Sequence, residues 1–207
     1  TIIDGMKRFG STETEICVRG LGILPEQIHE HVILAPWWDP SVLTGLGEVR
    51  RLSEPDASVQ IWDIRQKNGD ITFIKTGMGA PVFMDVLLSL GMTCCKKIIF
   101  VGSVGALDAE IGIGDIVIPE FSICGDGASR YIASGDLAGG DCWGEKTYPH
   151  PGFLQIVKEE TDRICKEHDI RWHPGKNISI DTISAQFAHI DTIVSLGCNV
   201  VEMETSV

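Results

Sequence analysis

The 207-residue chain has few basic residues: 17 Lys and Arg stand against 29 Asp and Glu, which gives a net charge of −12. Nucleic-acid backbones and anionic membrane surfaces are bound through clustered Lys and Arg, so the composition excludes both as partners. The sequence has no run of 18 apolar residues, so we predict no transmembrane helix. No basic segment followed by an apolar one stands at the N-terminus, so we predict no secretory signal.

The spacings typical of metal sites and disulfide frameworks are also missing. The seven cysteines are an odd number with no C-x-x-C pair, and the six histidines include no H-E-x-x-H motif. We therefore predict neither a zinc site nor a disulfide scaffold, and no metal or organic cofactor. Reduced, buried cysteines are typical of a cytoplasmic protein, which is the localisation we expect.

Short apolar runs alternate along the chain with helical patterns. Strands are predicted over 31–35, 58–65, 71–75, 97–101, 115–118, 178–183 and 198–201. Helices are predicted over 82–90, 153–168 and 185–196, with further helix starts at 39–40 and 202–207 and a long loop over 124–150. This alternation predicts an α/β fold, a three-layer sandwich with a central, mixed, mostly parallel twisted sheet covered by helices. We expect one domain over residues 1–207, in which residues 1–30 form an N-terminal extension.

Two glycine-containing turns follow predicted strands, Thr76-Gly77-Met78-Gly79 and Gly102-Ser103-Val104-Gly105. Ligands of parallel α/β sheets bind at the carboxyl ends of strands, and glycine allows backbone amides to approach an anion. Glycines required only by tight turns would give the same pattern. Ser103 is not in a G-x-S-x-G elbow, because Val101 replaces the first glycine, so a hydroxyl donor to a ligand is favoured over a nucleophile.

Two carboxylates flank one apolar residue in Glu202-Met203-Glu204, directly after the last predicted strand. Such carboxylates can accept hydrogen bonds from sugar hydroxyls and stabilise positive charge on a sugar ring. An ordinary acidic helix start is the alternative interpretation. Trp37-Trp38 leaves a similar choice between core packing and a stacking wall for a base.

Taken in order, these motifs resemble those of the nucleoside phosphorylase superfamily, of the uridine phosphorylase and hexameric purine nucleoside phosphorylase type. The matching segments are Pro36-x-x-Asp39-Pro40, Thr76-Gly77-Met78-Gly79-x-Pro81, Gly102-Ser103-x-Gly105-Ala106, Gly112-x-Gly114-Asp115-Ile116-Val117, Asp126-Gly127-Ala128-Ser129, Ser179-x-Asp181-Thr182 and Val201-Glu202-Met203-Glu204. The resemblance implies cleavage of the N-glycosidic bond of a nucleoside by phosphate, giving a free base and a pentose 1-phosphate. It also implies a homodimer or homohexamer, with inorganic phosphate as a co-substrate and no other cofactor.

The resemblance assigns roles to single residues but identifies no catalytic acid or base. The ribose-binding residues are Glu202, Met203, Glu204 and Met78, the phosphate-binding residues are Ser103, Gly102 and Gly79, and the base-binding residues are Gln186 and Thr182.

The chain departs from the family at the positions of three phosphate-binding arginines, where it has Ser41 or Val42, Val59 and Phe100. Arg forms bidentate, charge-assisted bonds to phosphate, so the loss weakens that site unless Arg50, Arg51 or Arg65 replaces it.

The uridine-type arginine that follows the base-reading glutamine is absent as well, and Ala188 and His189 stand there. Purine or pyrimidine preference therefore stays open, and so does the acceptor, phosphate or water. A nucleoside hydrolase of the same superfamily and a non-catalytic nucleoside-binding or storage protein remain alternatives. The family's closing helix, strand and helix are not in the sequence, and we expect them in an omitted tail.

Overall fold

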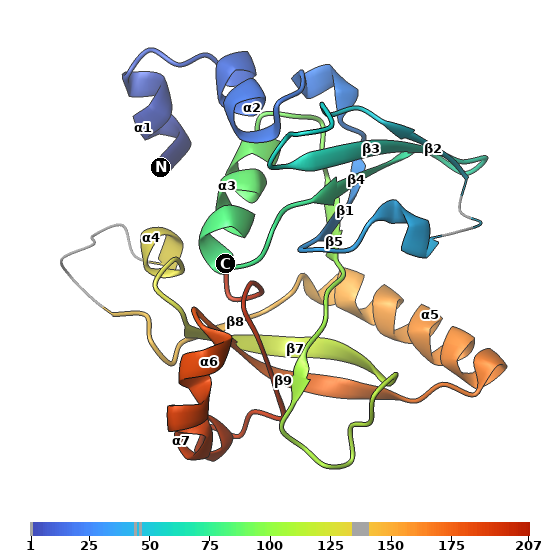
Figure 1. The fold of residues 1–207 in the computed structure, drawn as a ribbon, viewed down its shortest axis with the longest axis vertical. Coiled ribbons are helices and arrows are strands. Elements are labelled where there is room, and N and C mark those ends of the chain that lie inside the picture. The colour runs from blue at the N-terminus through green and yellow to red at the C-terminus, as the bar shows by residue number, and fades with distance from the viewer. Residues whose placement is uncertain (1, 44, 46, 134–140) are drawn as a thin grey trace. The chain divides into compact units, whose positions relative to one another are not determined.

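The computed structural model describes residues 2–43, 45, 47–133 and 141–207 (Figure 1). The chain divides into two compact units, Thr1–Gly102 and Ser103–Val207, and each has its own five-stranded sheet. Both sheets mix parallel and antiparallel pairs and are flanked by helices, which confirms the predicted α/β class. The structure has two five-stranded sheets where the sequence predicted one central sheet, and the single domain over residues 1–207 stays a prediction.

The sheet of the first unit has the order β2-β3-β4-β1-β5. Its strands are β1 (His31–Ala35), β2 (Glu48–Arg51), β3 (Gln60–Arg65), β4 (Ile71–Lys75) and β5 (Lys97–Phe100). Strand β1 pairs in parallel with β4 and β5, while β3 and β4 form the predicted antiparallel hairpin. The fully buried side chains of this sheet include Leu34, Ile61, Ile64, Phe73 and Ile74.

Helices of the first unit are α1 (Ile2–Arg8), α2 (Glu13–Leu21) and α3 (Ala80–Leu90), with 3₁₀ turns η1 (Pro25–Gln27) and η2 (Pro40–Leu43). Helix α2 begins with a capping box, in which Thr12 and Glu15 exchange side-chain-to-backbone hydrogen bonds. Because α2 packs against α3, the expected N-terminal extension is part of this unit. The helix predicted at residues 39–40 is only the short turn η2. Of the tryptophan pair, Trp38 packs against the core while Trp37 is half exposed.

The contact between α2 and α3 depends on Gly20, because a Cβ atom there would lie 1.9 Å from Ser89 Oγ and 2.8 Å from Ser89 Cβ. We expect Gly20→Ala to lower the free energy of unfolding by about 1–3 kcal/mol, measured by urea denaturation. Gly5→Ala in α1 is the matched control, since nothing lies within 4 Å of its added Cβ. Alanine favours helix over glycine, so this control should be neutral or stabilising. An equal effect of the two substitutions would contradict the prediction.

The sheet of the second unit has the order β6-β10-β9-β7-β8. Its strands are β6 (Gly105–Ala106), β7 (Ile116–Gly125), β8 (Lys146–Thr147), β9 (Trp172–Ile180) and β10 (Val200–Glu202). Strand β9 lies between β7 and β10 and is parallel to both. The helices are α4 (Arg130–Ala133), α5 (Pro151–His168), α6 (Ile183–Gln186) and α7 (Ile190–Ser195), and the 3₁₀ turn η3 (Phe187–His189) joins the last two.

Three predictions for the second unit are wrong in part. The expected loop over 124–150 contains the end of β7, helix α4 and strand β8, and its residues 134–140 lie outside the described residues. The helix expected over 185–196 is interrupted by η3. Residues 203–207 form turns in place of the expected helix start. Throughout the part of the chain that the structure describes, no helix is long and apolar enough to cross a membrane.

Candidate functional site

Glu202, at the end of β10, has a buried carboxylate that accepts five hydrogen bonds from the second unit. Its Oε1 atom accepts from Asn177 Nδ2 at 2.7 Å, from Ser179 Oγ and from Thr205 Oγ1 at 3.0 Å. Its Oε2 atom accepts from the backbone N–H groups of Glu204 at 2.6 Å and Thr205 at 2.9 Å. A carboxylate offers about four lone pairs, so these donors occupy all its accepting capacity. Glu202 therefore fixes the turn that follows it.

A second carboxylate holds the same turn from the Asp126-Gly127-Ala128-Ser129 motif. Asp126 accepts hydrogen bonds from Ser129 N at 2.8 Å and Ser129 Oγ at 2.7 Å, and Ser206 Oγ also donates to it. The backbone N–H of Ser206 donates to Ser179 Oγ at 2.9 Å. The turn after β10 is thus tied to both β9 and the end of β7.

Met203 and Glu204 lie in this turn, between Glu202 on one side and the hydrogen-bonded residues Thr205 and Ser206 on the other. Met203 packs against a buried apolar cluster that includes Ile180 and Ile193, and Glu204 is 5% exposed. Met203 and Glu204 are therefore held at the carboxyl edge of the sheet by the backbone of a fixed turn.

Beside this cluster lies a pocket of about 280 Å³. It is lined by Gly125, Trp143, Ile180, Asp181, Thr182, Ala185, Gln186, His189, Thr192, Ile193 and Leu196. Ile180 and Ile193 belong both to the pocket and to the cluster under Met203, so turn and pocket are neighbours. The structure therefore brings Thr182 and Gln186, the two predicted base-binding residues, into one pocket.

The polar groups of this pocket differ in how they are paired. Thr182 caps α6, because its hydroxyl accepts a hydrogen bond from Ala185 N at 3.4 Å. The Oε1 atom of Gln186 is buried and has no hydrogen-bond partner among the described residues. Of the two residues that follow in place of an arginine, His189 lines the pocket and Ala188 does not.

The predicted glycine turns are distributed over both units. In Thr76-Gly77-Met78-Gly79, the two glycines have φ angles of 88° and 100°, in the left-handed region that other residues rarely adopt. Met78 is 56% exposed, and α3 begins directly after Gly79. Gly102 ends the first unit, and Ser103 begins the second. The ribose and phosphate roles of Met78, Gly79, Gly102 and Ser103 stay predictions.

A family model described as the phosphorylase superfamily matches residues 49–207. The chain belongs to the phosphorylase superfamily. A search of curated proteins finds no match to the sequence.

Solved structures agree with this assignment. Uridine phosphorylase from Vibrio fischeri is 21% identical with a TM-score of 0.69, covering 87% of this chain and 72% of its own. Purine nucleoside phosphorylase from Toxoplasma gondii, in complex with immucillin-H, is 18% identical with a TM-score of 0.67, covering 89% and 71%. AMP nucleosidase from Bacteroides thetaiotaomicron is 18% identical with a TM-score of 0.75, covering 94% and 81%. At these identities the likeness shows the fold that phosphorylases and nucleosidases share.

The candidate replacements for the superfamily's phosphate-binding arginines are held by groups of the first unit. Arg50 Nη2 lies 3.3 Å and Arg65 Nε 3.1 Å from Asp63 Oδ2, and His29 Nε2 lies 2.8 Å from Asp63 Oδ1. The Asp63 side chain is 3% exposed, so its charge is balanced by these neighbours.

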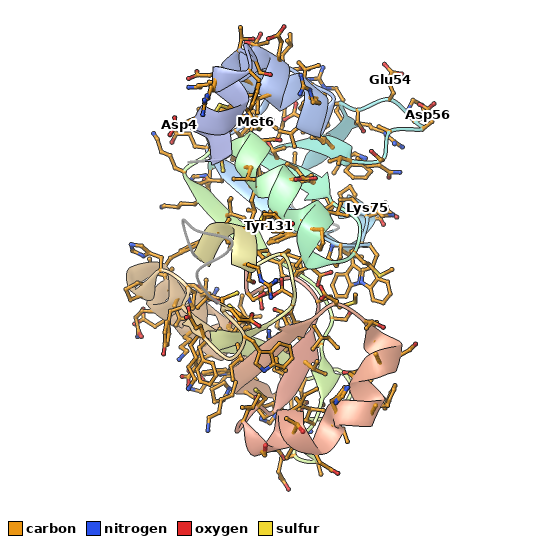
Figure 2. The ribbon with its side chains drawn as sticks, turned by 90° about the vertical axis from the view of Figure 1, so that its left-hand side faces the viewer. Asp4, Met6, Glu54, Asp56, Lys75 and Tyr131 are labelled. Atoms are coloured by element: carbon orange, nitrogen blue, oxygen red, sulfur yellow. The ribbon has the colours of Figure 1, made fainter. Side chains whose placement is uncertain are left out.

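Arg51, the last residue of β2, is held by the loop between β2 and β3. Its Nη2 atom donates to the backbone carbonyls of Glu54 at 3.0 Å and Pro55 at 3.1 Å, and its guanidinium lies 5.5 Å from the Trp62 ring centroid. The side chains of Glu54 and Asp56 point outward from this loop (Figure 2). Each of the three arginines thus has partners in its own unit.

The ion-pair cluster predicts a dependence of stability on pH. Burial alone would raise the pKa of Asp63, but the hydrogen bonds and charges of His29 and Arg65 outweigh it and lower the pKa below its usual value. A lowered pKa stabilises the folded state above the unfolded pKa of about 4, and this contribution is lost as the pH falls through the folded pKa. Melting temperatures between pH 3 and 6 should therefore show Asp63→Asn destabilised at pH 6 and the gap closing toward pH 3. Asp56→Asn, on the exposed loop, is the control, and a gap that stays constant with pH would contradict the prediction.

Among the residues described, no group of three or more His, Cys, Asp and Glu side chains is placed to hold a metal ion. Sequence reasoning missed Trp143 and Asp181 as pocket residues. Trp143 lay in a segment assigned to a loop, and Asp181 was noted only as part of a matching motif.

Proposed function

We propose that this chain cleaves the N-glycosidic bond of a nucleoside with phosphate. The observation that carries the proposal is the buried Glu202 carboxylate, which fixes the Met203-Glu204 turn beside a pocket containing Thr182 and Gln186. The bond from C1′ to the base nitrogen breaks and its electron pair leaves with the base. A phosphate oxygen bonds to C1′, and the proton of the hydrogen phosphate ends on the base, so the products are free base and pentose 1-phosphate.

In this reaction Glu204 accepts hydrogen bonds from the ribose hydroxyls, and its negative charge stabilises the positive charge that develops on the sugar. Met203 packs against the sugar, and Thr182 and Gln186 contact the base. Glu202, whose oxygen atoms are already occupied, is assigned a positioning role in place of the ribose contact that the resemblance implies. The phosphate contacts of Ser103, Gly102 and Gly79 and the sugar contact of Met78 stay predictions of the resemblance.

Hydrolysis is the second candidate, and one observation favours it. The positions that bind phosphate in the family are not basic here, and Arg50, Arg51 and Arg65 are engaged with other groups of the first unit. Water would then replace phosphate as the acceptor. Asp39, the one carboxylate near the end of β1 that could activate it, is paired with Lys75 Nζ at 3.2 Å.

The test is cleavage of purine and pyrimidine nucleosides with and without phosphate, followed by chromatography of the released base. Cleavage that requires phosphate is the expected result. Cleavage in both conditions would make the chain a nucleoside hydrolase. Binding without cleavage would leave a nucleoside-binding or storage protein and would overturn the proposal. The proposal includes a cytoplasmic homodimer or homohexamer, which analytical ultracentrifugation would detect as the assembled mass.

A further inference from the structure

Two side chains at the 3₁₀ turn between α6 and α7 line the pocket. A 3₁₀ turn has three residues per turn, so residues three apart lie one above the other. Gln186 and His189 have this spacing, and both line the pocket. Between them, Ala188 does not line it and Phe187 is 71% exposed. The spacing of three residues thus places an amide and an imidazole on one wall.

Two oxygen acceptors of the pocket lining have capacity left for a ligand. Asp181 contributes a carboxylate, which accepts one hydrogen bond from Gly127 N at 3.1 Å and has lone pairs to spare. Gln186 contributes a buried carbonyl oxygen without a partner in the described part of the chain. The described residues that line the pocket include no Lys or Arg, so none of them presents a permanently charged donor to a ligand.

His189 and Trp143 complete the lining. No hydrogen bond of the His189 ring is found within residues 2–43, 45, 47–133 and 141–207, so its nitrogen atoms are available to a ligand. A neutral imidazole offers one donor and one acceptor, whereas a guanidinium offers donors alone. Trp143, 55% exposed, offers an aromatic face on which a planar ring can stack.

We propose that this pocket selects a nucleobase with an exocyclic amino group, a 6-aminopurine or a 4-aminopyrimidine, over the matching keto base through the acceptors of Asp181 and Gln186, and that His189 permits this preference because a neutral imidazole can accept as well as donate. The inference rests on the proposed function, since the base read here is the one that is cleaved. An amino group donates to the acceptors of Asp181 and Gln186. A keto oxygen at the same place would face these acceptors unpaired, at the cost of desolvating a polar group.

The test compares two matched substrate pairs, adenosine with inosine and cytidine with uridine, which differ at one exocyclic group. We expect kcat/KM to favour the amino member of the accepted pair by at least about tenfold. His189→Arg replaces an adaptable ring with a donor, so it should abolish or reverse the preference. Phe187→Arg adds the same charge two residues away, at an exposed side chain outside the pocket lining, and should keep the preference within about twofold of the parent chain.

The outcomes separate this inference from the proposed function. Equal kcat/KM for both members of a pair would overturn the inference while leaving the proposed function intact. An unchanged preference in His189→Arg would overturn the role of His189. If no nucleoside is cleaved, the proposed function fails, and calorimetric titration with the same four nucleosides decides the inference. Tighter binding of the amino member would support it, and equal or absent binding would overturn it.

Discussion

Glu202→Ala is expected to lower the free energy of unfolding by about 3–5 kcal/mol, the cost of removing one partner from a buried charged network. The carboxylate accepts hydrogen bonds from Asn177, Ser179 and Thr205 and from two backbone N–H groups. Alanine would leave these donors without an acceptor, and the side chains of Asn177 and Ser179 are fully buried. The loss should therefore exceed that of an average core substitution.

Urea unfolding followed by circular dichroism measures this effect. Glu110→Ala is the matched control, because Glu110 is exposed, and its replacement should change the free energy by no more than about 0.5 kcal/mol. Glu202→Gln keeps one accepting oxygen and should fall between the two. If Glu202→Ala unfolds at the urea concentration of the parent chain, the anchoring role of Glu202 is wrong.

Glu204→Gln is expected to lower kcat/KM for the cleaved nucleoside about 100-fold or more. Two charge-assisted hydrogen bonds from ribose hydroxyls, each contributing about 1.5–3 kcal/mol, would lose their charge. The carboxylate would also no longer stabilise positive charge on the sugar in the transition state. The effect should appear in kcat as well as in KM, because part of it arises only in the transition state.

A substrate lacking one hydroxyl provides the control for this prediction. With a 2′-deoxynucleoside, Glu204→Gln should cost less than with the ribonucleoside, since one of the two hydrogen bonds is already absent. Glu145→Gln changes an exposed glutamate of the same unit and should leave kcat/KM unchanged. Equal losses with both substrates would remove Glu204 from the ribose site.

The local sequence predicted the bounds of a strand or helix well where a single sequence pattern determined them. Strand β1 begins and ends where predicted, because an uninterrupted apolar run is stopped by Pro36. Strand β4 was found equally well, since Asn68-Gly69 marks the turn before it. Helix α5 begins two residues before its predicted start, at Pro151.

Other elements depend on contacts that are distant in sequence. Strand β9 begins at Trp172, six residues before the strand predicted over 178–183. A Cβ atom on Gly175 would lie 2.7 Å from Val117 Cγ1 and 3.1 Å from Pro119 Cα, so the glycine lets two strands approach. Its position opposite Pro119 exists only in the paired sheet.

The sequence predicted those candidate site residues that lie in recognisable motifs. Thr182 and Gln186 were proposed through the resemblance, and the structure places both in one pocket. The resemblance assigned both Glu202 and Glu204 to the ribose site. Only the fold shows that the Glu202 carboxylate is fully occupied by hydrogen bonds within the protein.

The polar side chains shared by β7, β9 and β10 also protect the chain from strand slippage. Buried Ile and Val side chains recur in these strands, and a shift of two residues would keep every side chain on its own face of the sheet. A shift would separate Ser122 from Asn177 and Asn177 from Glu202, which now lie 3.0 Å and 2.7 Å apart. Misaligned sheets would then bury unpaired amide and carboxylate groups. The residues that fix the Met203-Glu204 turn thus also favour the native strand register during folding.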